Sequence, residues 1–369
     1  MTLQVPDRKA FRDASERRLQ LTKALFTVFG MFCVLVATEA VVRAQEGTAW
    51  KAVQVHLIFT DEALRLDKDL PPLQREDVKV KQGKNSLRVT QLISAQGENA
   101  ALQLMILIDD TLNPSVGNSL NEVKEFINAQ PPSAAIGVGY MSNAGVNVVQ
   151  AFTANHDLAV KAVRLPRGAI STMDSPYLSL ISLVKAWPQQ SVRREILMIS
   201  DGVDRLHGER PDPSRLGPDY SSLGHRPSYN SIHQRSNTSS VYHSMPAVSL
   251  DVTSASETSQ RYNVIVYSLY AAGVGRAGRS GWDLELGLAG LTSIADETGG
   301  ECFSLGTSQL VSFKPYLESL QKTLSNQYYV VFQALPRSKA GFQPIKVQTE
   351  LPNSELLAPD NVWVPASSR

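Results

Sequence analysis

Residues 193–204 read RREILMISDGVD, and this stretch has the pattern of a central strand in an α/β protein. Two arginines and a glutamate lead into five apolar or small residues, and the run stops at Asp201 and Gly202. A short apolar run with charge on one side and a turn signal on the other is typical of a strand buried on both faces of a parallel sheet. Asp201 is then expected at the carboxyl end of the strand, where open α/β sheets bind ligands.

A second run of the same kind covers residues 102–108, LQLMILI, and it also ends on acid, at Asp109 and Asp110. An Asp-Gly pair after a single strand is often only a turn. Two buried strands that bring carboxylates to one rim indicate more, because carboxylate oxygens are the ligands that hard cations prefer. We therefore expect a cation site at this rim of the sheet.

Between residues 100 and 335 the hydrophobic pattern alternates between strands and helices. Besides the two strands above, strands are expected at residues 134–141, 145–152, 263–270 and 301–305. Helices are expected at residues 120–127, 156–163, 176–187, 248–261, 284–298 and 309–325. This alternation predicts an α/β domain with a doubly wound, mainly parallel sheet of the Rossmann-like kind.

Two β segments flank this domain, which we expect to cover residues 100–335. Residues 50–98 alternate with period two around a Gln-Gly-Lys-Asn turn, which predicts a small β module without a cluster of catalytic residue types. The chain returns to β alternation at residues 328–334 and 342–350, and residues 336–369 are expected to form a C-terminal β extension.

Residues 1–44 have the pattern of an export signal. A basic stretch precedes an apolar run, and small residues follow at Val42 and Ala44. A membrane span needs about 20 apolar residues, and this run is shorter. Its length favours a cleaved signal peptide over an N-terminal membrane anchor formed by residues 24–42. The protein is thus expected in the periplasm, on the cell surface or secreted. Without this segment one cysteine remains, Cys302, which we expect to be buried and inert.

Residues 205–246 form a polar stretch without periodicity, which indicates an inserted loop. It carries four of the six histidines at spacings that match no ligand pattern, so we do not expect metal binding there. Because the loop follows Asp201 directly, a role in controlling access to the rim is a hypothesis.

Several function classes find little support in the sequence. A net charge of +1 and the absence of a basic stripe argue against nucleic acid as a partner. Residues 273–278 fit the pattern GxGxxG, but no helix begins directly after them, as a dinucleotide site requires. No nucleophile elbow, zinc-protease motif or Walker loop is present. We expect a protein that is not an enzyme, and a metal-assisted hydrolase stays open as the third alternative.

Three segments together carry a resemblance to a known family: DDTLN at residues 109–113, STMDS at residues 171–175 and SDGVD at residues 200–204. With the order of the elements, they resemble a von Willebrand factor type A domain over roughly residues 50–335. In combination with the preceding LQREDVKVKQGK, the chain is similar to the VWFA-related proteins of acidobacteria.

The resemblance implies a metal-ion-dependent adhesion site for Mg²⁺, or for Mn²⁺ or Ca²⁺ in its place. It would be formed by Asp109, Thr111, Asn113, Ser175 and Asp201. Asp109 would orient bound water, the next three would be oxygen donors, and Asp201 would be the third-loop aspartate. Asn113 departs from the family's serine, and Thr172 and Asp174 compete with Ser175 for the second-loop role.

The function implied is that of an exported, non-enzymatic protein that binds a protein ligand offering a carboxylate. Magnesium prefers six hard oxygens, and few carboxylates among its ligands leave it able to attract one more from a partner. The alternative is a structural or assembly module of the cell envelope with a vestigial metal site.

Overall fold

The structure is a computed structural model that describes residues 53–61, 72–188, 192–206, 249–273, 281–335, 337–352 and 356–367. The proposed export segment 1–44, residues 207–246 of the expected polar loop and residues 274–278 of the GxGxxG pattern lie outside these ranges. None of the helices in the described ranges is long and apolar enough to cross a membrane.

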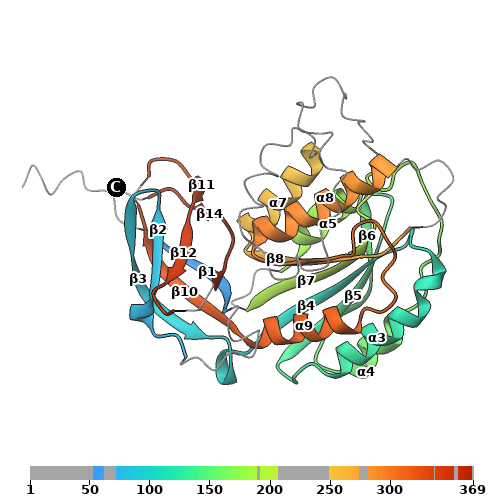
Figure 1. The fold of residues 1–369 in the computed structure, drawn as a ribbon, viewed down its shortest axis with the longest axis horizontal. Helices are drawn as coiled ribbons and strands as arrows, with labels where there is room; N and C mark the ends of the chain where they lie inside the picture. Colours follow the sequence, from blue (N-terminus) through green and yellow to red (C-terminus); the bar gives the residue numbers. More distant parts are fainter. Residues whose placement is uncertain are drawn as a thin grey trace, which may run out of the picture.

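The larger domain is built on a six-stranded sheet (Figure 1). Its strands, in spatial order, are β6 (Gly145–Thr153), β5 (Ala134–Ser142), β4 (Leu102–Asp109), β7 (Arg193–Ser200), β8 (Val264–Tyr270) and β9 (Cys302–Phe303). All neighbours are parallel except β6, which pairs with β5 in the antiparallel direction. The order is that of a doubly wound sheet, and an antiparallel edge strand is a common addition to it. The predicted fold class is confirmed.

Helices cover both faces of this sheet, as Figure 1 shows. One face carries α3 (Gly117–Asn128), α4 (His156–Ala162) and α9 (Lys314–Ser325), and the other carries α5 (Pro176–Ala186), α7 (Leu250–Arg261) and α8 (Gly281–Thr298). Alternate residues of β4 serve the two cores: Ile106 packs with the first group and Leu107 with the second. Both faces of β4 are therefore buried, which is why residues 104–108 form a continuous apolar run.

Two elements are at least three residues shorter than predicted. The last helix, expected from residue 309, begins at Lys314, because Pro315 lacks a backbone N–H and fits only the first turn of a helix. The strand expected over residues 301–305 is limited to Cys302–Phe303, since only Ser268 and Leu269 of β8 pair with it.

The remaining strands form a second, antiparallel sheet beside the domain (Figure 1). In spatial order they are β12 (Lys346–Thr349), β2 (Val78–Gln82), β3 (Asn85–Ser94), β10 (Gln327–Ala334), β1 (Val53–Asp61) and β13 (Leu356–Leu357). A separate ribbon pairs β11 (Gly341–Pro344) with β14 (Asn361–Val364), and three short 3-10 helices are η1 (Arg75–Asp77), η2 (Gly97–Asn99) and η3 (Pro114–Val116). We call the sheet and the ribbon together the β module.

The composition of the β module differs from the expected division into an N-terminal and a C-terminal β piece. Strand β10, which falls inside the expected range 100–335, lies between β1 and β3 and pairs with both. Its residues Val330 and Phe332 share one apolar core with Val55 and Leu57 of β1. Residues from both ends of the chain thus bury one common core.

A buried polar network joins the central strand β7 to the helix and strand that lead into the β module. Arg193 Nη1 donates to the Leu324 carbonyl at 2.8 Å and to Gln327 Oε1 at 2.6 Å. Gln327 Nε2 in turn donates to Tyr267 Oη at 2.9 Å. Glu195, fully buried, lies 3.8 Å from Arg193, and burial raises the pKa of its carboxyl group despite the nearby guanidinium. The α/β domain and the β module are therefore joined by buried polar groups that satisfy one another through hydrogen bonds and an ion pair.

Candidate functional site

The candidate site lies where β4 and β7 end. The two strands are paired in register, with Ile108 opposite Ile199, so their carboxyl ends reach the rim together. Asp109 is 3% exposed and Asp201 is not exposed at all. Ser200, between the end of β7 and Asp201, donates its hydroxyl to Asp109 Oδ2 at 2.7 Å. The rim therefore holds two buried carboxylates from neighbouring strands, as the sequence predicts.

The environment of these carboxylates disfavours two negative charges. Burial, and after it the charge of Asp201, raises the pKa of Asp109 to about 6. Burial also raises the pKa of Asp201, against the lowering effect of Arg205. Two like charges out of water repel one another strongly. A cation at this rim would relieve that repulsion.

Thr111 supplies a neutral oxygen beside the carboxylates. Its backbone N–H donates to Asp109 Oδ1 at 2.9 Å, and its side chain is buried. The hydroxyl is near enough to lower the pKa of Asp109, yet within the described ranges it makes no hydrogen bond of ordinary geometry. A buried hydroxyl without a partner is uncommon and points to a missing ligand such as an ion or water.

Ser175 reaches the same region from the start of α5. It is the N-cap of that helix and accepts a hydrogen bond from Leu178 N at 3.3 Å, while its hydroxyl donates to Asp204 Oδ2 at 3.1 Å. Since Asp204 follows Asp201 by three residues, Ser175 faces the segment that carries the third predicted ligand.

Arg205 places a positive charge at the rim. Its Nη2 lies 3.3 Å from Asp201 Oδ2, forming an ion pair between groups four residues apart. The other oxygen of Asp201, Oδ1, accepts from Val203 N at 3.0 Å. The carboxylate of Asp201 is thus already paired with a positive group of the protein, the Arg205 guanidinium.

Three solved structures are similar to part of this chain, with low sequence identity. An aerotolerance-related membrane protein from Bacteroides fragilis is 12% identical, with a TM-score of 0.38 over 61% of this chain and 98% of that one. A von Willebrand factor type A protein from Catenulispora acidiphila is 10% identical, with a TM-score of 0.35 over 87% of this chain and 75% of that one. The SpRpn10 VWA domain is 11% identical, with a TM-score of 0.31 over 60% and 93%.

No family model and no curated protein matches the chain. The decisive observation is the sheet itself, with five parallel strands in doubly wound order and one antiparallel edge strand, and acidic loops at the rim. The larger domain is therefore a doubly wound, Rossmann-like α/β domain with an antiparallel edge strand. The resemblance to von Willebrand factor type A domains and to the acidobacterial proteins stays a prediction.

Of the predicted ligands, Asn113 is used elsewhere. Its side chain is exposed, and its Oδ1 accepts from Ser115 N at 2.9 Å, which caps η3. Asparagine is a preferred N-cap residue because its carbonyl oxygen satisfies a free backbone N–H. The structure therefore brings Asp109, Thr111 and Asp201 to the rim, places Ser175 against the segment after Asp201, and turns the amide oxygen of Asn113 to a local helix.

The two alternatives for the second loop have other positions. Thr172 is exposed. Asp174 is buried, and its carboxylate accepts from Asn143 N at 2.8 Å and from Ser171 N at 2.6 Å. Asp174 thus stabilises the loop, which leaves Ser175 as the second-loop residue in this domain.

Asp110, next to Asp109, is neutralised by two arginines. Arg164 donates to both of its oxygens, at 2.7 and 3.0 Å, and Arg167 N donates at 2.9 Å. Burial alone would raise the pKa of Asp110, but these hydrogen bonds hold it below its ordinary value. The same contacts fix the segment after α4 beside the rim.

Arg205 and Ser200 belong to the candidate site but were not among the residues predicted from the sequence. Both lie within or beside the quoted stretch at 193–204, and a basic residue four positions after a rim aspartate was the available signal. The helix α8 was predicted, but its direct packing on the rim was not. Tyr177 Oη donates to the Gly202 carbonyl at 2.6 Å and to the Gly287 carbonyl at 3.3 Å, which joins α5, the rim and α8.

Gly287→Ala is expected to lower the free energy of unfolding by about 1–3 kcal/mol. A Cβ there would lie 2.5 Å from the Asp201 carbonyl oxygen and 2.9 Å from Gly202 C, so α8 would have to move off the rim. Urea unfolding measures the change. In the control Gly145→Ala the added carbon would meet nothing nearer than 3.7 Å. Equal losses in both variants would contradict the close approach of α8.

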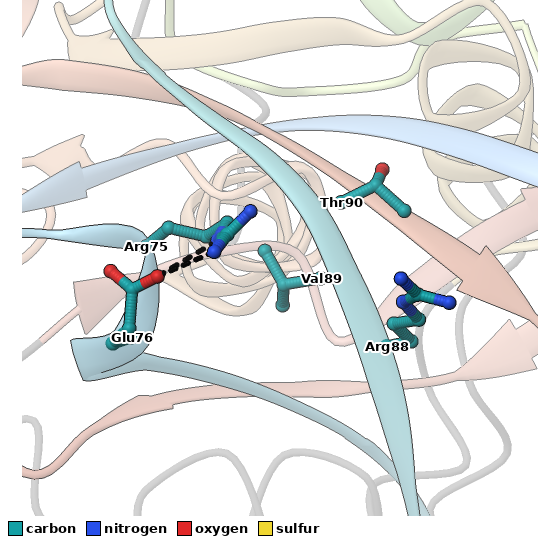
Figure 2. Close-up of a pocket in the computed structure, with 5 residues that line it drawn as sticks. All are labelled: Arg75, Glu76, Arg88, Val89 and Thr90. Atoms are coloured by element: carbon teal, nitrogen blue, oxygen red, sulfur yellow. Dashed lines mark hydrogen bonds and ion pairs between the residues drawn. The ribbon is translucent and has the colours of Figure 1, made fainter.

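Other candidate groups in the described ranges offer no second site. No cluster of three or more His, Cys, Asp or Glu residues that could hold a metal is found there. Burial raises the pKa of the Cys302 thiol to about 12, so it is not a thiolate at neutral pH. A pocket of about 340 Å³ lies on the β module. Figure 2 shows the residues that line it: Arg75, Glu76, Arg88, Val89 and Thr90. The Arg75 guanidinium there is hydrogen-bonded to Glu76, and the pocket contains no rim residue.

Proposed function

We propose that the protein is an exported, non-enzymatic interaction protein whose von Willebrand factor type A domain binds a protein ligand through a divalent cation at the β4–β7 rim. Asp109, Thr111, Ser175 and Asp201 would hold the cation, with Asn113 joining only if it leaves its cap on η3. The observation that carries the proposal is the pair of buried carboxylates next to the unpartnered Thr111 hydroxyl.

The donor set suits Mg²⁺, or Mn²⁺ or Ca²⁺ in its place. It consists of two carboxylates and neutral hydroxyls, which are hard oxygen ligands and too few to complete six-fold coordination. When bound, the cation would supply a Lewis-acidic centre that attracts a carboxylate of the partner. Water would complete the coordination in the absence of that partner.

The surface beside the rim supports a protein as the ligand. The segment between α4 and α5 exposes three large apolar side chains by half or more: Leu165, Ile170 and Met173. The segment is held by backbone hydrogen bonds, including Gly168 N to the Asp110 carbonyl at 2.9 Å. Ordered, exposed apolar side chains next to a polar centre are typical of protein contacts.

Export is part of the proposal and is supported by the sequence of residues 1–44. The protein would act in the periplasm, on the cell surface or outside the cell, with membrane association if residues 24–42 are retained. Nucleic acid is not among the proposed partners. A screen against ester, peptide and phosphate substrates with Mn²⁺ tests the hydrolase alternative, and turnover lost in Asp201→Ala would contradict the non-enzymatic assignment.

Calorimetric titration with Mg²⁺ and Mn²⁺ tests the cation site. Wild type is expected to bind, and a free ion concentration 100 times the Kd should raise the free energy of unfolding by about 2.7 kcal/mol. Asp201→Ala should show neither heat nor a melting shift. Peptides with and without a carboxylate, offered in Mg²⁺ or chelator, then test the partner: binding is expected only with both the carboxylate and the cation.

A second candidate is a structural or assembly module of the envelope that works without metal. It is favoured by the Arg205–Asp201 ion pair and by the use of Asn113 as a helix cap. Absence of heat and of a melting shift in wild type would support this candidate over the cation-dependent one.

A further inference from the structure

The side chain of Arg205 contacts Asp201 at the rim, where the proposed function places a divalent cation. Its Nη2 lies 3.3 Å from Asp201 Oδ2, and its Nη1 donates to the Val203 carbonyl at 3.3 Å. Asp201 has no exposed surface, whereas 11% of the Arg205 side chain is exposed. The Arg205 side chain therefore keeps some contact with solvent, whereas the Asp201 carboxylate has none.

The backbone of Arg205 is fixed independently of this ion pair. Arg205 N donates to the Asp174 carbonyl at 2.8 Å, and Leu206 N donates to the same oxygen at 3.1 Å. Asp174 is itself bound to the turn after β5 through Asn143 N. The backbone of this segment is thus held by contacts other than the ion pair with Asp201.

We propose that Arg205 is the built-in cation of the rim. In the cation-free protein its guanidinium balances the charge of Asp201, and a divalent ion binds to that carboxylate only after the guanidinium has left. The second half of this statement rests on the proposed function, whereas the first half stands without it.

Burial separates this ion pair from an ordinary surface pair. Exposed pairs contribute little because water screens both charges. Here both carboxylates are at most 3% exposed, and removal of one partner of a buried pair leaves a charge without compensation. The charge of Arg205 is therefore needed as long as no other cation is present.

A divalent ion and the Arg205 guanidinium would compete for the same oxygen atom, Asp201 Oδ2. A magnesium ion that took Asp201 Oδ2 as a ligand would lie about 2.1 Å from that oxygen, and Arg205 Nη2 is 3.3 Å from the same atom. Two positive groups at one oxygen would repel each other and compete for the same lone pairs. Arg205 should accordingly weaken the binding of a divalent ion to the rim.

Arg205→Gln tests the proposal, with Arg167→Gln as the matched control. The control removes the same charge from a 70% exposed side chain near the rim that contacts Asp110, not Asp201. In chelator, Arg205→Gln should melt about 5 °C or more below wild type, and the control should be unchanged. In calorimetric titration with Mn²⁺, Arg205→Gln should bind at least tenfold more tightly than wild type, and the control as wild type does.

Arg205→Lys keeps the charge and covers the case in which the glutamine variant does not fold. It should melt between wild type and Arg205→Gln, and its gain in Mn²⁺ affinity should be smaller. An unchanged melting temperature of Arg205→Gln in chelator would overturn the proposal. So would Mn²⁺ binding by wild type without a gain in the variants. A destabilised Arg205→Gln together with no Mn²⁺ binding in any variant would support the built-in cation and reject the cation-dependent function.

Discussion

Arg193→Met is expected to lower the free energy of unfolding by about 3–5 kcal/mol. The variant leaves the fully buried Glu195 without its counter-charge, and Gln327 and the Leu324 carbonyl lose the donor that Arg193 supplies. A buried carboxylate without a counter-charge is costly, and methionine fills the space of the arginine stem without replacing the hydrogen bonds. Urea unfolding at pH 7 in chelator measures the loss.

The double variant Arg193→Met/Glu195→Leu provides the informative control. Because it removes both charges, it should recover much of the stability lost in the single variant. Arg75→Met removes an arginine from the exposed pair with Glu76 on the β module and should leave stability unchanged. A single variant as stable as wild type would show that the network does not join the two units.

Lowering the pH from 7.5 to about 4.5 in chelator is expected to stabilise the protein relative to Asp109→Asn. Burial and Asp201 raise the pKa of Asp109 from 3.8 to about 6, so the folded protein binds this proton more tightly than the unfolded chain does. Stability then rises as the pH falls from about 6 towards 4. The shift corresponds to about 3 kcal/mol for a group that is ionised at pH 7.5.

Asp109→Asn should consequently be more stable than wild type at pH 7.5, by up to about 3 kcal/mol, and the two should converge near pH 4. Urea unfolding at a series of pH values gives both curves. The comparison cancels the other titrating groups, including Asp110 and Glu195. If the advantage of Asp109→Asn grew as the pH fell, the pKa of Asp109 would be lowered in the fold, contrary to the expectation.

The sequence contains enough information to place the rim. Residues 104–108 and 196–199 are continuous apolar runs, which are typical of strands buried on both faces, and parallel strands end at one edge. The positions of Asp109 and Asp201 follow from that alone. Ser175 is marked by the Pro176 after it, because serine at an N-cap followed by proline is a strong helix-start signal.

The contacts that decide the chemistry of the rim are not visible in the same way. Asn113 could ligate or cap, and the choice depends on whether η3 forms after it. Arg205 lies beyond the end of the strand, where no periodicity indicates the direction of a side chain. The position of β10 between β1 and β3 depends on pairing across more than 230 residues, as in Val331 opposite Gln91, and such long-range register has no local signal.

The pairing of β3 with β10 has one more consequence. Ser94 at the end of β3 lies opposite Tyr328 at the start of β10, and Ala95 N donates to the Gln327 carbonyl at 2.9 Å. The chain therefore leaves the sheet at the end of β3 and re-enters it at the paired position at the start of β10. The α/β domain is thus inserted between two antiparallel strands, where a hairpin would have only a turn. Exchanging residues 96–326 for a short Asn-Gly turn would leave a continuous antiparallel host sheet.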